Sequence, residues 1–263
     1  MPNLLRAAAR THLGLVRENN EDSFYVGDRL ILVADGMGGH AAGEVASTIT
    51  KDVLAALDHE RPSEDIIASL TQGIDKATAE IARHVADNPA LEGMGTTVTA
   101  VMFGDRRIAV ANIGDSRAYL YQANEHKLTQ LTSDDSFVQL MVDNGDITPD
   151  QAQHHPYRNV VLKSLNGQDV QPRFTTLRRI AGDRYLLCTD GLTDYVARAD
   201  IITSLDIDDV DAAADRLVEL VLEAGAPDNV TVVLIDILTA DESAPTTDPG
   251  ADTAVSTIIA DEE

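Results

Sequence analysis

Three aspartates stand at the ends of apolar, strand-like runs, and they are the residues most able to do chemistry. They are Asp35, Asp190 and Asp228. Asp35 and Asp190 each follow such a run and precede a glycine, whereas Asp228 comes just before the last run. If that last run is antiparallel to the other two, its start lies beside their ends and the three carboxylates meet at one rim of a sheet. Clustered carboxylates repel one another unless cations neutralise them, and oxygen-rich sites suit Mg²⁺ or Mn²⁺.

A turn is the plain alternative for each aspartate, since Asp-Gly is a common turn dipeptide. That interpretation stays open for any one of them, but three such placements together favour a site. A further charged segment, Arg17-Glu18-Asn19-Asn20-Glu21-Asp22, precedes the first strand-like run. Arg17 offers a planar fork that can bind a phosphate through two parallel hydrogen bonds. Glu21 and Asp22 point to opposite faces if they begin a strand, so at most one faces a shared site directly. Taken alone, this hexapeptide is better interpreted as a solvated run of charges.

Apolar periodicity predicts the elements that must position these residues. Period-two runs predict strands at 22–26, 30–34, 96–103, 107–113, 117–122, 173–177, 184–189 and 230–238. Apolar residues at spacings of three and four predict helices at 44–57, at about 67–85 with Ser63 as the cap, and at 210–224. The polar segment from about 133 to 167, with Pro149 and Pro156, is interpreted as an insertion or lid between strands. Two consecutive helices between groups of strands argue against βαβ alternation and favour an α+β layered domain.

Composition limits the possible partners. The 263 residues include 20 Lys and Arg against 44 Asp and Glu, a formal net charge of −24. So acidic a chain repels nucleic acid and anionic lipid. The single cysteine, Cys188, lies in an apolar run and predicts a buried thiol rather than a nucleophile. We expect no signal peptide and no membrane span, because the longest apolar stretch is far shorter than the roughly 20 residues that a span needs.

Several motifs in order along the chain resemble the type-2C, metal-dependent serine/threonine protein phosphatases (the PPM family) in their bacterial form. They are Arg17-x-x-Asn20-Glu21-Asp22, Ala34-Asp35-Gly36-Met37-Gly38-Gly39-His40, Gly95-Thr96-Thr97, Asn112-Ile113-Gly114-Asp115-Ser116-Arg117, Thr189-Asp190-Gly191 and Asp228-Asn229. The resemblance implies a four-layer αββα sandwich of two mainly antiparallel sheets, formed by residues 1–239. Residues 240–263, which contain seven acids and no Lys or Arg, are interpreted as an acidic disordered tail or linker.

The resemblance also implies a role for each motif. Two or three Mn²⁺ or Mg²⁺ ions would be held by Asp35, Gly36, Asp115, Asp190 and Asp228, with Glu21 and Asp22 acting through bound water. A metal-activated water would attack phosphorus in line. Arg17 would bind the substrate phosphate. Met37 occupies the position at which eukaryotic members carry a histidine, and His40 is the nearest candidate general acid.

Further expectations concern partners and place. The resemblance implies phosphorylated proteins as substrates, in particular a serine/threonine kinase and its targets. It also implies a cytoplasmic monomer, or the cytoplasmic domain of a membrane-anchored protein. Two other functions compete. Gly36-x-Gly38-x-x-Ala41 matches a loose dinucleotide-binding fingerprint, but a second helix follows where that fold needs a parallel strand. The second competing function is that of a binding module, performed by a catalytically degenerate phosphatase. The intact Asp35, Asp190 and Asp228 argue against it.

Overall fold

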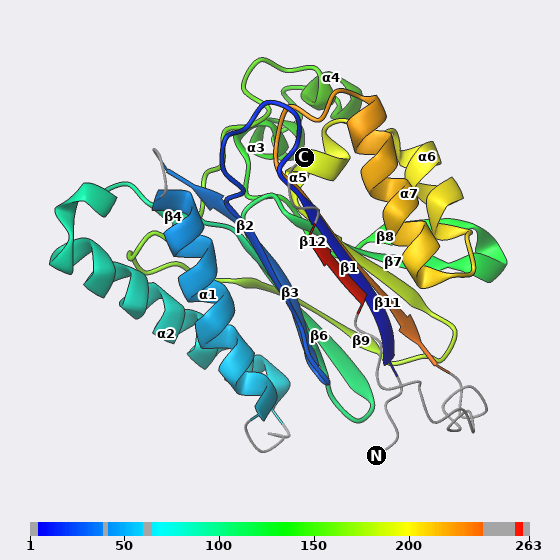
Figure 1. Ribbon diagram of the computed structural model, residues 1–263, viewed down its shortest axis with the longest axis horizontal. Coiled ribbons are helices and arrows are strands. Elements are labelled where there is room, and N and C mark those ends of the chain that lie inside the picture. Colours follow the sequence, from blue (N-terminus) through cyan, green and yellow to red (C-terminus); the bar gives the residue numbers. More distant parts are fainter. Residues whose placement is uncertain (1–4, 39–41, 60–64, 239–255, 260–263) are drawn as a thin grey trace.

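The computed structural model describes residues 5–38, 42–59, 65–238 and 256–259, which form two sheets stacked face to face (Figure 1). The first sheet has the order β12 (Ser256–Ile259), β1 (Leu5–His12), β11 (Val230–Ile237), β10 (Arg184–Cys188), β7 (Arg117–Gln122) and β8 (Lys127–Gln130). The second has the order β2 (Asp22–Val26), β3 (Leu30–Met37), β5 (Val98–Phe103), β6 (Arg107–Ile113) and β9 (Arg173–Arg178), with β4 (Gly95–Thr96) paired to β3. Within the described ranges, neighbouring strands are antiparallel except for the parallel pair of β1 and β12.

Helices cover the outer face of each sheet. On the second sheet lie α1 (Ala42–His59) and α2 (Ile66–Asp87), and on the first lie α6 (Arg198–Leu205) and α7 (Val210–Glu223) (Figure 1). The shorter helices are α3 (Phe137–Asp143), α4 (Pro149–Gln153), α5 (Asp190–Thr193), η1 (Pro89–Leu91) and η2 (Ala123–Glu125). None of the helices in the described ranges combines the length and the apolar composition needed to cross a membrane. The expected αββα sandwich is confirmed, and its antiparallel sheets leave no place for a dinucleotide-binding βαβ unit.

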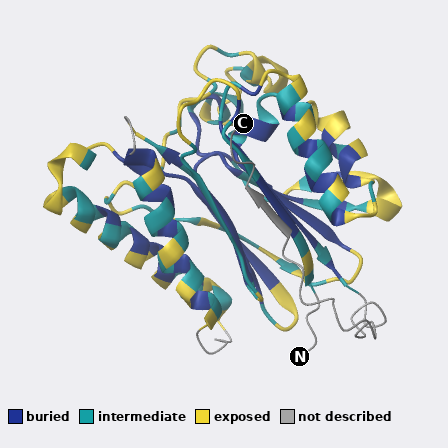
Figure 2. Ribbon diagram, in the orientation of Figure 1, coloured by how far each residue is buried: buried dark blue, intermediate teal, exposed yellow. Residues whose placement is uncertain are grey.

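Strands with apolar side chains on both faces produce the four layers. In β5, Val98 and Ala100 pack against α1 and α2, whereas Val101 and Phe103 point toward the other sheet. The same alternation holds in β11, where the even-numbered positions from 230 to 234 face α7 and the odd-numbered positions from 233 to 237 face the second sheet. Successive side chains of a strand point to opposite faces, so one apolar strand can serve two cores. Figure 2 shows burial concentrated between the layers and exposure on the outer helix faces.

Most predicted elements are confirmed, with bounds that differ by a few residues. The helix cap was wrong: Asp65, not Ser63, accepts the hydrogen bond from Ala68 N at 3.0 Å, and Ser63 lies outside the described residues. Strands β1 and β8 and helix α6 were not predicted. Of the predicted tail, only Ser256–Ile259 is described, and it forms β12 beside β1.

The segment from 133 to 167, hereafter the flap, contains α3 and α4 and returns to the body at both ends. Leu165 is fully buried and exchanges backbone hydrogen bonds with Thr96, at 3.0 and 2.8 Å. At the other end, the buried Asp135 pairs with Lys163 at 3.2 Å and with Arg173 at 3.1 Å. These contacts fix the base of the flap against the second sheet.

Candidate metal centre

Four aspartates come together at one end of the sandwich, two from each sheet. Asp22 and Asp35 are partners in the register of β2 and β3. Asp190 follows β10 and Asp228 precedes β11, and these two strands are antiparallel neighbours. The expected meeting of Asp190 and Asp228 at one rim is therefore confirmed. The expectation that Asp35 shares their sheet was wrong, because β3 belongs to the other sheet and Asp35 reaches the site across the sandwich.

Burial and mutual repulsion shape the electrostatics of this cluster. Burial, followed by the charges of Asp22 and Asp190, raises the pKa of Asp35 well above its ordinary value. Burial, followed by the charges of Asp115 and Asp194, does the same to the pKa of Asp190. These two carboxyl groups therefore favour their protonated form unless a cation lies beside them. A divalent cation between them would remove the repulsion.

Asp22 is the most informative member of the cluster. Its Oδ2 accepts a hydrogen bond from the Thr189 hydroxyl at 3.0 Å, and this bond joins the two sheets. Its Oδ1 is buried and has no hydrogen-bond partner among the described residues. Burial is the main cause that raises the Asp22 pKa to about 7. A buried carboxylate oxygen without a donor is costly, so this oxygen fits a role as acceptor for a metal or for its water.

Asp115 extends the cluster from the turn between β6 and β7. It follows Gly114, whose φ of +102° belongs to the left-handed region, and its side chain is buried. Burial, followed by the charge of Asp134, raises its pKa to about 7. The contribution of Asp115 to the high pKa values of Asp35 and Asp190 places it in the same acidic group.

Thr97 links Asp35 to the Asp115 turn, a role that the motif Gly95-Thr96-Thr97 did not reveal. The backbone N–H of Asp35 donates to Thr97 Oγ1 at 2.9 Å, and Thr97 Oγ1 lies 2.7 Å from Ser116 Oγ. Thr97 N and Thr96 Oγ1 both donate to the Asp35 carbonyl, at 2.8 and 2.9 Å. The backbone of Asp35 is therefore held on both sides.

Two glycines of the motifs, Gly36 and Gly191, allow a second segment of the chain to pack closely against them and are not needed for a turn. A Cβ on Gly36 would lie 2.2 Å from the Gly43 carbonyl oxygen, so β3 continues through Asp35-Gly36 beside the start of α1. A Cβ on Gly191 would lie 1.9 Å from the carbonyl oxygen of Asn229. Both glycines bring segments of the cluster into contact that any larger residue would separate.

Arg17 lies at the edge of the cluster. Its Nη2 donates to Asp228 Oδ2 at 2.8 Å, and 49% of its side chain is exposed. The neighbouring Asn229 organises this edge: its Oδ1 accepts from Glu21 N at 2.9 Å, and its Nδ2 donates to the Leu13 and Asn19 carbonyls at 2.8 and 3.0 Å. Sequence reasoning had singled out Asp228 in this pair and missed the part played by Asn229.

The flap approaches the cluster through Arg158, which pairs with Asp194 at 3.4 Å. Asp194 lies in the turn after α5 and belongs to the charges that act on Asp190. His40 lies outside the described residues, so its role stays a prediction. Cys188 is fully buried, and burial raises the pKa of its thiol to about 12, which excludes a thiolate nucleophile at neutral pH.

The donor set fits a hydrated, oxygen-loving cation. Among the described residues, no three carboxylate, histidine or cysteine side chains converge closely enough to hold an ion by themselves. Mg²⁺ keeps several waters and is commonly held through one or two carboxylates, and Mn²⁺ shares its preference for oxygen. The repelling carboxylates and the unpartnered Asp22 Oδ1 agree with that mode of binding.

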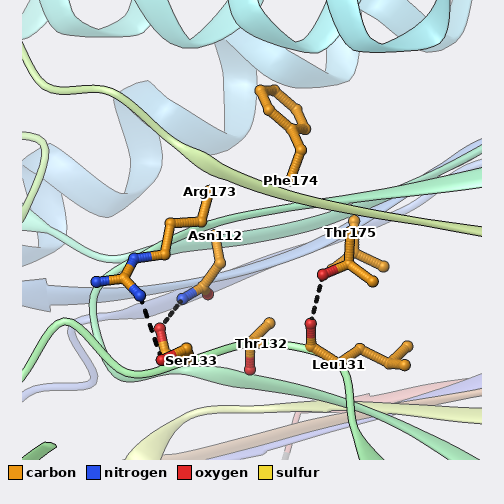
Figure 3. A pocket seen from close by; sticks show the side chains of 8 residues that line it. Asn112, Leu131, Thr132, Ser133, Arg173, Phe174 and Thr175 are labelled. Atoms are coloured by element: carbon orange, nitrogen blue, oxygen red, sulfur yellow. Dashed lines mark hydrogen bonds between the residues drawn. The ribbon is translucent and has the colours of Figure 1, made fainter. Parts of the chain in front are cut away.

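A cavity of about 220 Å³ lies apart from the aspartates, between the second sheet and the segment before the flap (Figure 3). Its wall is closed by hydrogen bonds from Thr175 to the Leu131 carbonyl at 2.8 Å and from Arg173 to Ser133 Oγ at 3.3 Å. None of the clustered acids lines this cavity.

Comparison with known proteins gives consistent similarities. The family model for protein phosphatase 2C matches residues 16–238. Serine/threonine protein phosphatase PstP of Mycobacterium tuberculosis is 51% identical over 235 residues, covering 89% of this chain but 45% of that protein. Serine/threonine phosphatase stp of Listeria monocytogenes is 33% identical, covering 88% of this chain and 96% of that protein.

Solved structures agree with the sequence relatives. A crystal structure of Mycobacterium tuberculosis PstP/Ppp has a TM-score of 0.87 at 50% identity and covers 89% of this chain and 99% of that chain. A structure of the PstP catalytic domain in complex with two manganese ions has a TM-score of 0.84 at 49% identity, with the same coverage.

Proposed function

Because the chain belongs to the protein phosphatase 2C family, we propose that it hydrolyses phosphoserine and phosphothreonine in proteins with the help of divalent cations. The observation that carries the proposal is the half-buried cluster of repelling aspartates, two from each sheet. Such a cluster is unfavourable in an apo protein and is explained by bound metal. Relatives named serine/threonine phosphatases support the reaction, and a related domain in complex with two manganese ions supports the cofactor.

The residues that would hold the cations follow from the family motifs and from the cluster. Asp35, the Gly36 carbonyl, Asp190 and Asp228 would bind two ions, and Asp115 with Asp190 would bind a third. Glu21 and Asp22 would act through bound water, which agrees with the buried, unpartnered Oδ1 of Asp22. Thr96 and Thr97 hold the backbone of Asp35 in place for this role.

When bound, the cations would lower the pKa of a coordinated water and stabilise negative charge on the phosphoryl group. The protein's own residues supply positioning. Arg17 uses Nη2 in its bond to Asp228, and the guanidinium has five N–H donors in all, so others can bind phosphate oxygens in a forked arrangement. Thr189 and Thr97 hold Asp22 and Asp35 in place, and the half-buried setting of the carboxylates reduces the screening of their charges by water.

The natural substrates would be proteins phosphorylated by a serine/threonine kinase, and the kinase itself. The names of the bacterial relatives support phosphorylated proteins as the class of substrate. The chain spans less than half the length of the first curated relatives that it matches.

Hydrolysis of an aryl phosphate and of a phosphothreonine peptide tests the proposal. Activity is expected with Mn²⁺ or Mg²⁺, absent with chelator, and lost in Asp190→Ala. A matched control is Asp75→Ala, an exposed acid on α2, which should keep full activity. Folded wild-type protein that neither binds metal nor hydrolyses either substrate would instead favour a binding module.

A further inference from the structure

Two aliphatic side chains lie exposed directly beside the phosphate-binding candidate Arg17. Leu15 and Val16 expose 65% and 67% of their surface, more than any other large hydrophobic residue in the described ranges. They sit in the segment that joins β1 to β2, the dark blue loop at the top of Figure 1. Single exposed aliphatic residues are common, and this adjacent pair presents nonpolar surface at the edge of the site.

The loop that carries this pair is held rigidly to the metal-site segment. Leu15 N donates to the Ala226 carbonyl at 2.8 Å, and Gly14 N donates to His12 Nδ1 at 2.9 Å. Gly14 has a φ of +84°, and a Cβ there would lie 2.3 Å from the Asp228 carbonyl oxygen. The side-chain amide of Asn229 binds the carbonyls on both sides of the pair, at Leu13 and Asn19. These contacts hold the backbone of the loop that carries Leu15 and Val16 against the segment that contains Asp228.

We propose that Leu15 and Val16 bind an apolar side chain next to the phosphorylated residue of the substrate protein. The inference rests on the proposed function, because it takes Arg17 as the group that binds the phosphate. A polypeptide whose phosphate reaches Arg17 must bring its neighbouring residues over this loop, since Val16 is adjacent to Arg17 in the chain. Leu15 and Val16 present nonpolar surface there. Burial of that surface would favour binding of a substrate with an aliphatic residue beside the phosphorylated one, and would not favour a substrate with a polar residue there.

Two phosphothreonine peptides that differ only beside the phosphorylated residue provide the test. One carries leucines on both sides of it and the other carries serines. With Mn²⁺, the wild-type protein should show a kcat/KM about tenfold higher for the leucine peptide, because partial burial of one aliphatic side chain is worth about a factor of ten. The double variant Leu15→Ser/Val16→Ser should reduce this preference to less than about twofold, and Leu15→Met/Val16→Ile should restore it.

Two controls separate the possible outcomes. Ile180 is another exposed aliphatic residue, at 53% exposure, and the variant Ile180→Ser should keep the tenfold preference for the leucine peptide. An aryl phosphate has no flanking residues, so the double variant should lose far less kcat/KM on it than on the leucine peptide. Equal turnover of the two peptides by active wild-type protein, or a preference that survives in the double variant, would overturn the inference. Absence of turnover even for the aryl phosphate would overturn the proposed function and this inference with it.

Discussion

Asp22 and Asp35 face each other directly across the β2–β3 ladder, so two carboxylates occupy one cross-strand pair. Like charges in that position are destabilising. Both residues are half-buried, and this burial is the main cause that raises the pKa of each carboxyl. Divalent cations, which this family binds, would offset the repulsion that remains at this pair.

Metal should stabilise the folded protein strongly. Saturation with Mn²⁺ at about 100 times its dissociation constant is expected to add about 2.7 kcal/mol to the free energy of unfolding, because the unfolded chain lacks the assembled site. Thermal melts at increasing Mn²⁺ and in chelator would measure this shift. Asp190→Ala should melt at nearly the same temperature with and without metal. An unchanged wild-type melting temperature would contradict the metal site.

The metal-free protein should lose stability as pH rises through the weakly acidic range. Asp22 and Asp115 each have a pKa raised to about 7 in the folded state, against about 3.9 in an unfolded chain. Between these values the folded state binds more protons than the unfolded state, so the free energy of unfolding falls until the pH exceeds about 7. Urea unfolding in chelator at pH 5.5, 7 and 8.5 would show the decline. Asp22→Asn should flatten it, and greater stability at pH 8.5 than at pH 5.5 would refute the assignment.

Arg17 should contribute to phosphate binding through the planar shape of its guanidinium as well as through its charge. Arg17→Lys keeps the charge but loses the fork, so kcat/KM for an aryl phosphate is expected to fall about 10- to 100-fold. Arg17→Ala should fall at least as far. Steady-state kinetics at saturating Mn²⁺ would measure both, with Arg83→Lys as the control, since Arg83 forms exposed ion pairs within α2. Full activity in Arg17→Lys would remove Arg17 from phosphate binding.

Thr97→Val should weaken metal binding although Thr97 is not itself a proposed metal ligand. The change leaves the Asp35 N–H without its acceptor and breaks the contact with Ser116. We expect a loss of about 1–3 kcal/mol in stability and of about 10- to 100-fold in Mn²⁺ affinity. Calorimetric Mn²⁺ titration of the variant beside Thr71→Val would check this, since Thr71 is a half-buried threonine of α2 whose hydroxyl donates to the Ile67 carbonyl. Equal Mn²⁺ affinity in the two variants would show that Thr97 has no positioning role.

Gly191→Ala should separate Asp190 from Asp228. Its Cβ would meet the Asn229 carbonyl oxygen at 1.9 Å, so one of the two segments must move. A destabilisation of about 2–3 kcal/mol and a large loss of metal-dependent activity are expected. Gly93→Ala is the control, because nothing lies within 4 Å of its Cβ and only its φ of +88° adds strain. A milder effect at Gly191 than at Gly93 in urea unfolding would contradict the close contact.

Local sequence was sufficient to predict a strand where the residues of that segment alone determine its structure. The apolar runs predicted β2, β3, β6, β7 and β11, because alternating branched and aromatic side chains fit a half-buried or buried strand. It was insufficient for β1, whose sequence LRAAARTH is rich in residues with low strand propensity. That segment becomes a strand by pairing along its whole length with β11, from Leu5 with Ile237 to His12 with Val230.

The sequence alone determined the inventory of the site: acids at strand ends, glycines beside them, an arginine upstream, and their order along the chain, which identified the family. Tertiary structure decided which of them meet, in that Asp22 and Asp35 come from one sheet and Asp190 and Asp228 from the other. It also decided the supporting contacts of Thr97, Thr189 and Asn229, and the exposure of Leu15 and Val16. The reason is physical: a residue's type is a local property, whereas its partners and burial depend on segments that are distant in sequence and adjacent only after the two sheets have packed.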